Sequence, residues 1–337
     1  MKAFGLSKVV SFSKLPSTAL ALIFAFAAAS SHSDYSQHAA AEAVIDTLVS
    51  DHGFSREEVV AILSKADTEQ RILDSMANAA EKTKTWTAYR TGFLSPIRIK
   101  KGVEFLAKHQ QTFDQVEEQY GVPRAVITAI LGVETNYGGY TGKASVLDAL
   151  ATLAFEHPRR SKFFTSELTE FIILSREQQW KADQQLGSYA GAMGMSQFMP
   201  SNYRRLAVDG NDDGTVNLFE PVDAIHSIAN YFVHHGWVPG GPVTSRASVN
   251  ASFDTSVIGK GLKPNKTVSE LDIAGYYPQD KIAATEKARV VRFNDDDGDE
   301  FWFGYQNFYV ISRYNPRSKY AMAVYHLSQV IALEAKL

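Results

Sequence analysis

The segment spanning residues 122–134, VPRAVITAILGVE, constrains this chain more than any other because it is apolar almost all round. A surface helix carries its apolar residues along one stripe, whereas a helix without a polar face must be enclosed by other elements. Pro123 suits the first turn of such a helix, and Gly138 with Gly139 suits its end after Tyr137. The chain must therefore build a layered core around this helix, and its 337 residues leave room for two or three compact units.

A carboxylate closes this apolar segment. Glu134 lies one turn beyond Ile130 and Leu131, so its side chain shares their face. Burial and the negative end of the helix dipole both disfavour the charged form, and we expect the pKa of Glu134 to be raised. A glutamic acid of that kind can donate a proton near neutral pH. The alternative is a helix-end glutamate paired with a surface Arg or Lys.

A glycine-rich segment, GSYAGAMGMSQFMP at residues 187–200, is the second candidate site. Ser188, Gln197 and nearby backbone amides are groups that can hold the acetamido and hydroxyl groups of a sugar. Glycine has no side chain, so such turns let another molecule approach the backbone closely. The alternative is a tightly packed contact between a helix and a loop, with the three methionines of the segment as filler.

Composition removes several classes of function. There are 34 Lys and Arg against 37 Asp and Glu, a net charge of −3, so we expect no general binding to nucleic acid. The absence of cysteine excludes disulfides, thiolate metal sites, cysteine nucleophiles and a thioether-linked lipid anchor. No organic cofactor is expected. The remaining chemistry belongs to carboxylates, hydroxyls, amides, histidines and ions bound by oxygen.

Residues 1–29 resemble a targeting segment. They carry Lys2, Lys8 and Lys14 without any acid, then an apolar run at 19–29 that ends in small residues. This pattern is typical of a secretory signal peptide. A permanent anchor is the alternative, although the run is shorter than the roughly 18 residues that span a bilayer. We therefore expect a periplasmic protein with no integral membrane span in the mature chain.

Apolar spacing predicts an α+β fold that is mainly α. Helical patterns fill residues 37–120 and continue through 121–239, whereas aromatic-rich alternating runs predict a small β domain at 240–312. The predicted strands are 290–293, 301–303 and 308–311, with a polar turn at 294–299. A last helix, at 318–337, closes the helical domain.

Residues 209–220, DGNDDGTVNLFE, fit the twelve-residue loop of an EF-hand. Gly214 stands at the sixth position, where the loop turns sharply. The predicted calcium ligands are Asp209, Asn211, Asp213, the carbonyl of Thr215 and Glu220. The ion is expected to be structural, because the loop leads into the helix that carries Tyr231. The alternative is an acidic turn with no ion. The equally acidic stretch at 294–300 lacks the spacing and is predicted to be a hairpin turn.

Four segments in order carry a resemblance to a known family. They are GVETNYGGYTGKASVLDALATLAFEHPRR (132–160), GSYAGAMGMSQFMPSNY (187–203), EPVDAIHSIANYFVHHGW (220–237) and NFYVISRYN (307–315). The chain resembles the lytic murein transglycosylase B family through nearly all of its mature length. The resemblance implies a lysozyme-like catalytic core at 121–239, flanked by the helical and β domains. It also implies cleavage of the β-1,4 bond between N-acetylmuramic acid and N-acetylglucosamine in peptidoglycan strands, with a 1,6-anhydromuramoyl end.

The resemblance assigns roles to residues of this chain. Glu134 corresponds to the family's catalytic acid/base. The expected substrate-binding residues are Ser188, Gln197, Tyr89, Arg159, Arg160, Tyr231, Tyr314, Asn315 and Tyr320. Phe163 departs from the pattern, because relatives often have tyrosine there, and any hydrogen bond from that position is in doubt.

The implied mechanism uses one carboxylate. A glycosidase with two carboxylates needs a second one across the bond, and the settings of Asp148, Glu156 and Asp183 nominate none of them. Two alternatives stay open: a muramidase that hydrolyses the same bond with water, and a calcium-stabilised peptidoglycan-binding protein without catalysis. Because it acts outside the cytoplasm on an immobile polymer, the protein could also dock with cell-wall synthesis enzymes, although no segment identifies one.

Overall fold

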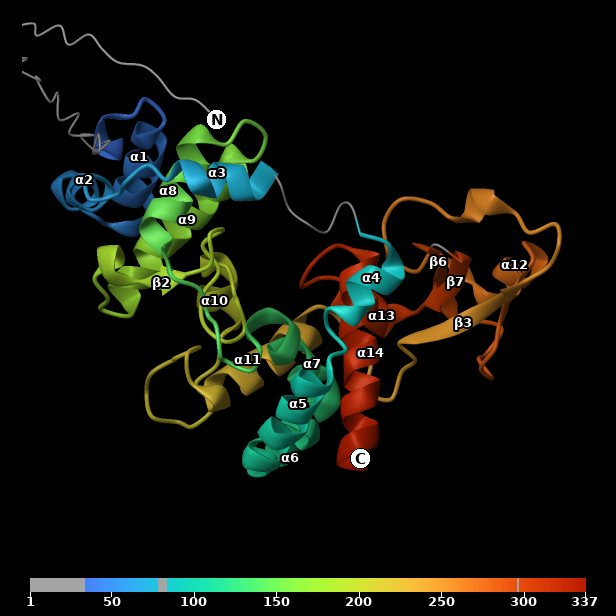
Figure 1. Cartoon of the computed structure of the whole chain (residues 1–337). Helices are drawn as coiled ribbons and strands as arrows, with labels where there is room; N and C mark the ends of the chain where they lie inside the picture. Colours follow the sequence, from blue (N-terminus) through green and yellow to red (C-terminus); the bar gives the residue numbers. More distant parts are fainter. Residues whose placement is uncertain (1–33, 78–83, 296) are drawn as a thin grey trace, which may run out of the picture. The chain divides into compact units, whose positions relative to one another are not determined.

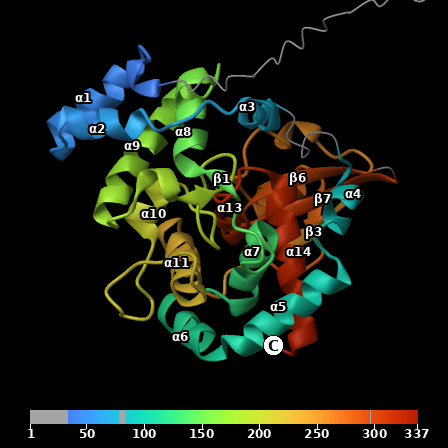
Figure 2. The ribbon, with the colours of Figure 1, turned by 60° about the vertical axis from the view of Figure 1, so that its left-hand side comes forward.

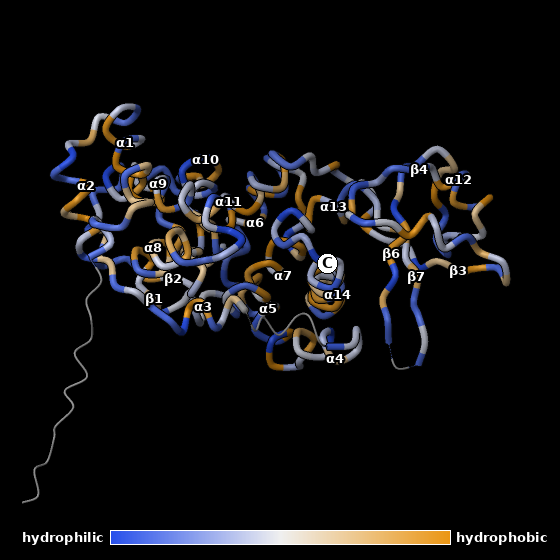
Figure 3. Tube along the Cα trace, turned by 90° about the horizontal axis from the view of Figure 1, so that it is seen from above, coloured by the Kyte–Doolittle hydropathy of each residue, from blue (hydrophilic) through white to orange (hydrophobic). Residues whose placement is uncertain are grey.

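The apolar segment forms helix α7 (Arg124–Thr135) in the computed structural model, which describes residues 34–77, 84–295 and 297–337. Nine of its 12 residues are buried. Helices α5 (Pro96–Lys108), α6 (Gln110–Tyr120), α11 (Pro221–His234) and α14 (Ser318–Ala335) pack against α7. Figure 2 shows α7 beside α14, and Figure 3 shows the hydrophobic colouring of α7. The predicted signal peptide lies outside the described residues.

The N-terminal part of the described chain is helical, as its spacing predicted (Figure 1). Ser55, Thr85 and Ser95 each begin a helix by accepting a hydrogen bond from the backbone N–H three residues later. Before α5 and α6 the elements are η1 (Tyr35–Gln37), α1 (Ala41–His52), α2 (Arg56–Leu63), α3 (Gln70–Ala77) and α4 (Trp86–Thr91).

The segment that follows α7 is built around a pair of packed helices, α8 (Val146–Glu156) and α9 (Ser161–Glu177). A two-stranded ladder, β1 (Ala144–Ser145) with β2 (Leu186–Gly187), joins the start of α8 to the glycine-rich segment. The remaining elements before α11 are η3 (Ala182–Gln184) and α10 (Pro200–Leu206).

An antiparallel five-stranded sheet follows α11, with the strand order β4-β6-β7-β3-β5. Aromatic and aliphatic side chains from four of its strands and from α12 form a core separate from that around α7. The elements are β3 (Thr244–Val249), η4 (Thr255–Val257), β4 (Lys266–Thr267), α12 (Val268–Ile273), β5 (Tyr276–Pro278), β6 (Lys287–Asp295) and β7 (Gly298–Gly304). The acidic stretch at 294–300 is the β6–β7 hairpin that was predicted. The domain boundaries stay a prediction.

The predicted strand at 308–311 is wrong, because this run belongs to helix α13 (Gln306–Ile311). A short run of buried apolar residues has no period that separates a strand from a helix. Asn307 decides the outcome: its side chain accepts a hydrogen bond from the backbone N–H of Val238 and donates to the carbonyls of Val238 and Gly241. These contacts dock the segment as a helix against the turn after α11. In the described part of the chain, no helix is both long and apolar enough to cross a membrane.

Candidate active site

Glu134 lies in the last turn of α7, and the chain reverses directly after it. Asn136 and Tyr137 both have left-handed backbone conformations, with φ of 51° and 62°. The helix therefore ends at Thr135, two residues earlier than predicted. Non-glycine residues adopt this conformation at a cost, so the surrounding structure must hold them there.

Two hydrogen bonds hold the reversal. The Thr135 hydroxyl donates to the carbonyl of Met195, 3.0 Å away, and so ties the helix end to the glycine-rich segment. The Tyr137 hydroxyl donates to the carbonyl of Arg98 on α5, at 2.9 Å. The Tyr137 ring also lies so close to Gly132 that a Cβ there would come within 2.6 Å of the hydroxyl oxygen. Glu134 thus stands on a backbone fixed from two sides.

Three tyrosines surround the carboxylate: Tyr231 from α11, Tyr314 from the turn after α13, and Tyr320 from α14. The Tyr320 hydroxyl, from the first turn of α14, donates a hydrogen bond to Oε1 of Glu134. The rings of Tyr231 and Tyr314 lie 4.5 Å apart, and the Tyr231 hydroxyl donates to the carbonyl of Arg313 at 2.6 Å. The Tyr314 hydroxyl is buried and has no hydrogen-bond partner among the described residues.

Burial raises the pKa of all three hydroxyls, and the charge of Glu134 raises each of them further. Tyr231, Tyr314 and Tyr320 are therefore neutral at physiological pH and serve as hydrogen-bond donors. Among the described groups, Glu134 is the one carboxylate whose charge acts on all three. The structure thus brings together four of the residues that the sequence singled out: Glu134, Tyr231, Tyr314 and Tyr320.

The glycine-rich segment lies against the helix end with its polar side chains partly engaged. The Ser188 hydroxyl accepts hydrogen bonds from the backbone N–H of Ala190 and of Ala192. Nε2 of Gln197 donates to the carbonyls of Thr141 and Gly194. The Ser188 hydroxyl hydrogen and Oε1 of Gln197 are the groups through which these side chains can contact a ligand.

The glycines of this segment serve internal packing instead of the predicted approach by another molecule. A Cβ at Gly191 would lie 2.4 Å from the side chain of Leu150, and one at Gly194 would lie 2.5 Å from that of Leu218. The space beside Gly187 is occupied by the backbone of Ala192 and the side chain of Val146. The tightly packed contact, left open as the alternative for this segment, therefore accounts for these three glycines.

The remaining candidates occupy other places. Arg159 and Arg160 are exposed on the turn between α8 and α9, and the guanidinium of Arg160 lies 4.6 Å from the ring centre of Phe163. Asn315 follows Tyr314 and is half-buried. Tyr89, on α4, is 6% exposed and lines a neighbouring cavity.

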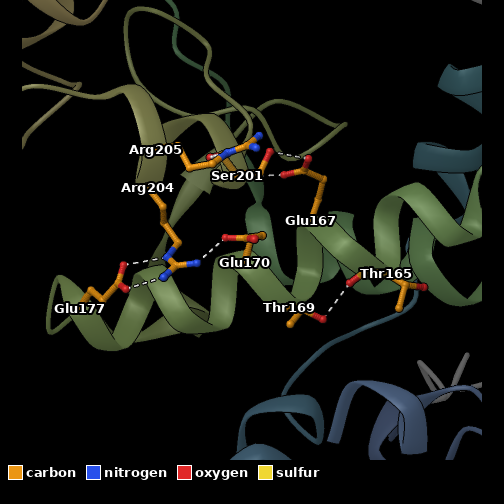
Figure 4. A network of polar contacts seen from close by, with 8 residues as sticks. All are labelled: Thr165, Glu167, Thr169, Glu170, Glu177, Ser201, Arg204 and Arg205. Atoms are coloured by element: carbon orange, nitrogen blue, oxygen red, sulfur yellow. Dashed lines mark hydrogen bonds and ion pairs between the residues drawn. The ribbon is translucent and has the colours of Figure 1, made fainter. Parts of the chain in front are cut away.

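A buried carboxylate that the sequence reasoning missed is Glu167, which is 5% exposed on α9. It accepts hydrogen bonds from the backbone N–H and the hydroxyl of Ser201, at 3.0 and 2.7 Å, and so caps α10 (Figure 4). Burial raises the pKa of Glu167. The sequence pattern that identified Glu134, an acid on an apolar helix face, was also present here, because Glu167 lies between Phe164 and Phe171. Nearby, Arg204 of α10 binds Glu170 and Glu177 of α9 (Figure 4).

The three acids that the sequence left without a role are occupied elsewhere or exposed. Asp148 accepts a hydrogen bond from the backbone N–H of Asp67, and Asp183 lies 3.6 Å from the Lys65 ammonium. Glu156 is exposed at the end of α8.

The loop at 209–220 connects α10 to α11 and turns tightly on itself. Asp209 accepts hydrogen bonds from the backbone N–H of Asp213 and of Gly214, and Gly214 has a φ of 87°. Asp223, buried in the first turn of α11, accepts from the backbone N–H of Gly210 and of Asn217 and clamps the loop to the helix. In the described ranges, no three His, Asp or Glu side chains converge as a metal site.

Comparison with known proteins decides the family. The family described as "Transglycosylase SLT domain" matches residues 36–329. The membrane-bound lytic murein transglycosylase B of Escherichia coli (strain K12) is 40% identical over 309 residues, which cover 89% of this chain and 84% of that protein. This chain belongs to the lytic murein transglycosylase B family. It is a peptidoglycan lytic transglycosylase.

Solved structures of lytic transglycosylases share its fold. The soluble lytic transglycosylase SltB1 of Pseudomonas aeruginosa matches with a TM-score of 0.82 and 43% identity, covering 88% of this chain and 99% of that one. The Escherichia coli lytic transglycosylase Slt35, solved in complex with calcium, matches with a TM-score of 0.81 and 40% identity, covering 90% and 96%. The predicted fold class, α+β and mainly α with a lysozyme-like core, is confirmed.

Proposed function

We propose that Glu134 is the single catalytic acid/base of this lytic transglycosylase. The substrate bond is the β-1,4 linkage between N-acetylmuramic acid and N-acetylglucosamine, and the product ends in a 1,6-anhydromuramoyl group. The observation that carries the proposal is the hydrogen bond from Tyr320 to Glu134 within a cluster of neutral tyrosines. Such a site has one carboxylate, which can both donate and accept the proton. The tyrosine hydroxyls around it keep their own protons and act only as hydrogen-bond donors.

The reaction balances with that one group. Protonated Glu134 donates its proton to the leaving glycosidic oxygen as the bond to C1 breaks. The acetamido carbonyl of the muramyl sugar stabilises the cation at C1. The Glu134 carboxylate then removes the proton from the C6 hydroxyl, whose oxygen bonds to C1. No water is consumed, and Glu134 regains its proton.

The apolar helix and the tyrosine have opposite effects on Glu134. Desolvation along α7 and the helix dipole favour the protonated acid that the first step needs. The hydrogen bond from Tyr320 favours the carboxylate that the second step needs. We propose that the balance between them keeps Glu134 protonated in the resting enzyme, with a pKa above that of an exposed glutamate.

The other candidate residues bind the glycan strand in this proposal. A buried hydroxyl without a partner is costly, so the Tyr314 hydroxyl is suited to a sugar group that completes its hydrogen bond. We assign further contacts to Ser188, Gln197, Tyr89, Arg159, Arg160, Tyr231 and Asn315.

Digestion of purified peptidoglycan by the wild type and by Glu134→Gln tests the mechanism. The amide keeps the shape of the side chain but has no proton to transfer, so we expect glycan binding to persist and cleavage to fall by several orders of magnitude. Mass spectrometry separates the products, because an anhydro end is lighter than a hydrolysed end by one water. Near-normal cleavage by the variant would refute the role of Glu134, and hydrated ends from the wild type would identify a muramidase.

We also propose that the loop at 209–220 binds Ca²⁺ through Asp209, Asn211, Asp213, the Thr215 carbonyl and Glu220. These groups are all oxygen donors, the set that calcium prefers. The Glu220 carboxylate is exposed at the start of α11 and makes no ion pair within the described residues, so it can turn toward the ion. The relative Slt35, solved in complex with calcium, supports this assignment. The ion would fix the loop and hence the start of α11.

The substrate and the segment at 1–29 support a periplasmic location after secretion. Peptidoglycan lies outside the cytoplasm, and the related Escherichia coli protein is named as membrane-bound. Docking to cell-wall synthesis enzymes and the division into domains at 37–120, 121–239 and 240–312 remain part of this proposal.

A further inference from the structure

A cavity of about 570 Å³ lies where α4, the sheet and the start of α14 meet. One wall is the loop at 258–262, and another is strand β6. Tyr89 of α4 lines it, although the resemblance placed this tyrosine in the substrate cleft. The described polar residues of the lining are Tyr89, Arg292, Asn294, Arg317, Ser318 and Lys319.

The charge of this cavity is one-sided. Three cations line it and, among its described lining residues, there is no carboxylate. Arg292 makes only a loose, half-exposed ion pair with Asp299, at 3.6 Å, on the neighbouring strand β7. The first turn of α14 adds to the positive potential, because its N-cap residue is an arginine, whose side chain cannot accept hydrogen bonds from the backbone N–H groups of that turn.

A buried arginine stands behind the cavity wall. Arg289, on β6, is 8% exposed and donates from Nη2 to the carbonyl of Lys260, at 3.1 Å. Its Nε is buried and has no hydrogen-bond partner among the described residues. A Cβ at Gly259, a lining residue, would lie 2.2 Å from Nη2, so the guanidinium packs directly against the backbone of this wall. A further positive charge is thus held close to the cavity.

The cavity and the proposed catalytic carboxylate share one turn of helix. Arg317, Ser318 and Lys319 line the cavity, and Tyr320, the next residue, donates to Glu134. Arg317 is the extended residue directly before this turn, and Ser318, Lys319 and Tyr320 are the first three residues of α14 itself. A group that extends from a sugar bound near Glu134 can therefore reach the cavity along α14.

We propose that this cavity binds a carboxylate of the peptide stem carried by the muramyl sugar. In peptide-bearing strands the free carboxylates lie on the stem peptides, because the lactyl carboxyl group of each muramyl sugar is taken up in the amide bond to its peptide. The inference rests on the proposed function, because it assumes that the muramyl bond is cleaved at Glu134. Arg292 and Arg317 bind the carboxylate directly, and Arg289 contributes by its charge. The enzyme consequently prefers strands that keep their peptides.

Three substrates test the proposal with the full-length enzyme: strands with intact peptides, strands stripped of peptides by an amidase, and strands whose peptide carboxylates have been amidated. We expect the wild type to cleave the first with the highest kcat/KM. Arg292→Gln and Arg317→Gln should each lower kcat/KM on peptide-bearing strands about fivefold, as for a partly exposed ion pair, and the double variant at least tenfold. On amidated strands the variants should match the wild type. They should also match it on stripped strands, whose remaining carboxylate is the lactyl group on the sugar itself and does not extend from the sugar to the cavity.

Arg246→Gln is the matched control. Arg246 is an exposed arginine of the same sheet, paired loosely with Glu300 at 3.8 Å, and it does not line the cavity. Its replacement removes the same charge and should leave the preference for peptide-bearing strands intact. Equal losses on all three substrates, or no loss in the double variant, would overturn the subsite. Anhydro products from stripped strands report on the proposed function separately, so the two failures are distinguishable.

Discussion

One hydrogen bond at the proposed catalytic carboxylate links residues 186 positions apart in sequence, Glu134 on α7 and Tyr320 on α14. The Tyr320 hydroxyl has a pKa raised by burial, so it keeps its proton and cannot serve as an acid itself. The Tyr320 hydroxyl instead acts on Glu134: its hydrogen bond stabilises the charged form of the carboxylate and favours negative charge on Oε1.

Replacing Tyr320 with phenylalanine should move the pH dependence of the reaction. Loss of a hydrogen bond to a charged group costs roughly 1.5–3 kcal/mol, so the carboxylate becomes less stable and the pKa of Glu134 rises by about one to two units. Because the first step needs protonated Glu134, activity persists to higher pH and the alkaline limb of the kcat profile shifts upward. We expect kcat at the optimum to fall about tenfold, since the second step loses its positioned base.

Tyr314→Phe serves as the comparison for this shift. The Tyr314 hydroxyl donates to no described residue, so its loss should affect KM for the glycan strand and leave the alkaline limb in place. A limb that stays fixed, or moves to lower pH, in Tyr320→Phe would show that Tyr320 does not control the ionisation of Glu134.

The apolar spacing of residues 122–134 was enough to predict helix α7, its burial and the acid at its end. The spacing could not predict where the helix stops. Asn136 and Tyr137 adopt left-handed conformations where Thr135 bonds to Met195 and Tyr137 bonds to Arg98, and both partners are distant in sequence. The pairing of Glu134 with Tyr320 escaped the spacing argument for the same reason.

Other errors also come from contacts between elements. The run at 308–311 has the residue types of a strand, but the hydrogen bonds of Asn307 dock it as helix α13. Glycines at 187, 191 and 194 suggested an open surface, although the chain's own side chains and backbone fill the space beside them. Residue type alone does not say which molecule occupies the space next to a glycine.

The junction of α5, α7 and the reversal after Glu134 depends on small residues beneath Tyr137. In Gly132→Ala the new Cβ would lie 2.6 Å from the Tyr137 hydroxyl oxygen and 2.7 Å from Cζ. Overpacking of this kind costs about 1–3 kcal/mol, against a gain of roughly 1 kcal/mol from the better helix propensity of alanine. We expect a net loss of unfolding free energy by denaturant titration, and a lower kcat because Glu134 shifts with the helix end.

A double variant separates crowding from any other effect of the alanine. With the ring removed in Tyr137→Ala, the added methyl of Gly132→Ala has space, and the propensity gain should emerge. We therefore expect Gly132→Ala/Tyr137→Ala to be at least as stable as Tyr137→Ala alone. Additive losses in the double variant would mean that Tyr137 is not what Gly132 accommodates.

At the scale of the whole molecule, helix α11 connects the proposed ion site to the active site. Asp223 in its first turn holds the loop at 209–220, and Tyr231, two turns later, donates to the carbonyl of Arg313 just after α13. The loop, α11 and the tyrosine cluster thus form one chain of contacts. If the loop becomes less ordered, the free energy of unfolding of the core should therefore fall.

Removal of calcium should therefore lower the melting temperature of the enzyme. An ion that binds only the folded state at a hundred times its Kd adds about 2.7 kcal/mol, which corresponds to a shift of several degrees for a chain of this size. Thermal unfolding with and without a chelator measures this shift, and calorimetry of the chelated protein measures the uptake. Asp209→Asn should melt at the lower temperature and no longer respond to the chelator. Asp299→Asn, in the acidic β6–β7 hairpin that lacks the loop spacing, should respond like the wild type. An unchanged melting temperature together with no calcium uptake would leave the loop as a clamp made by Asp223 alone.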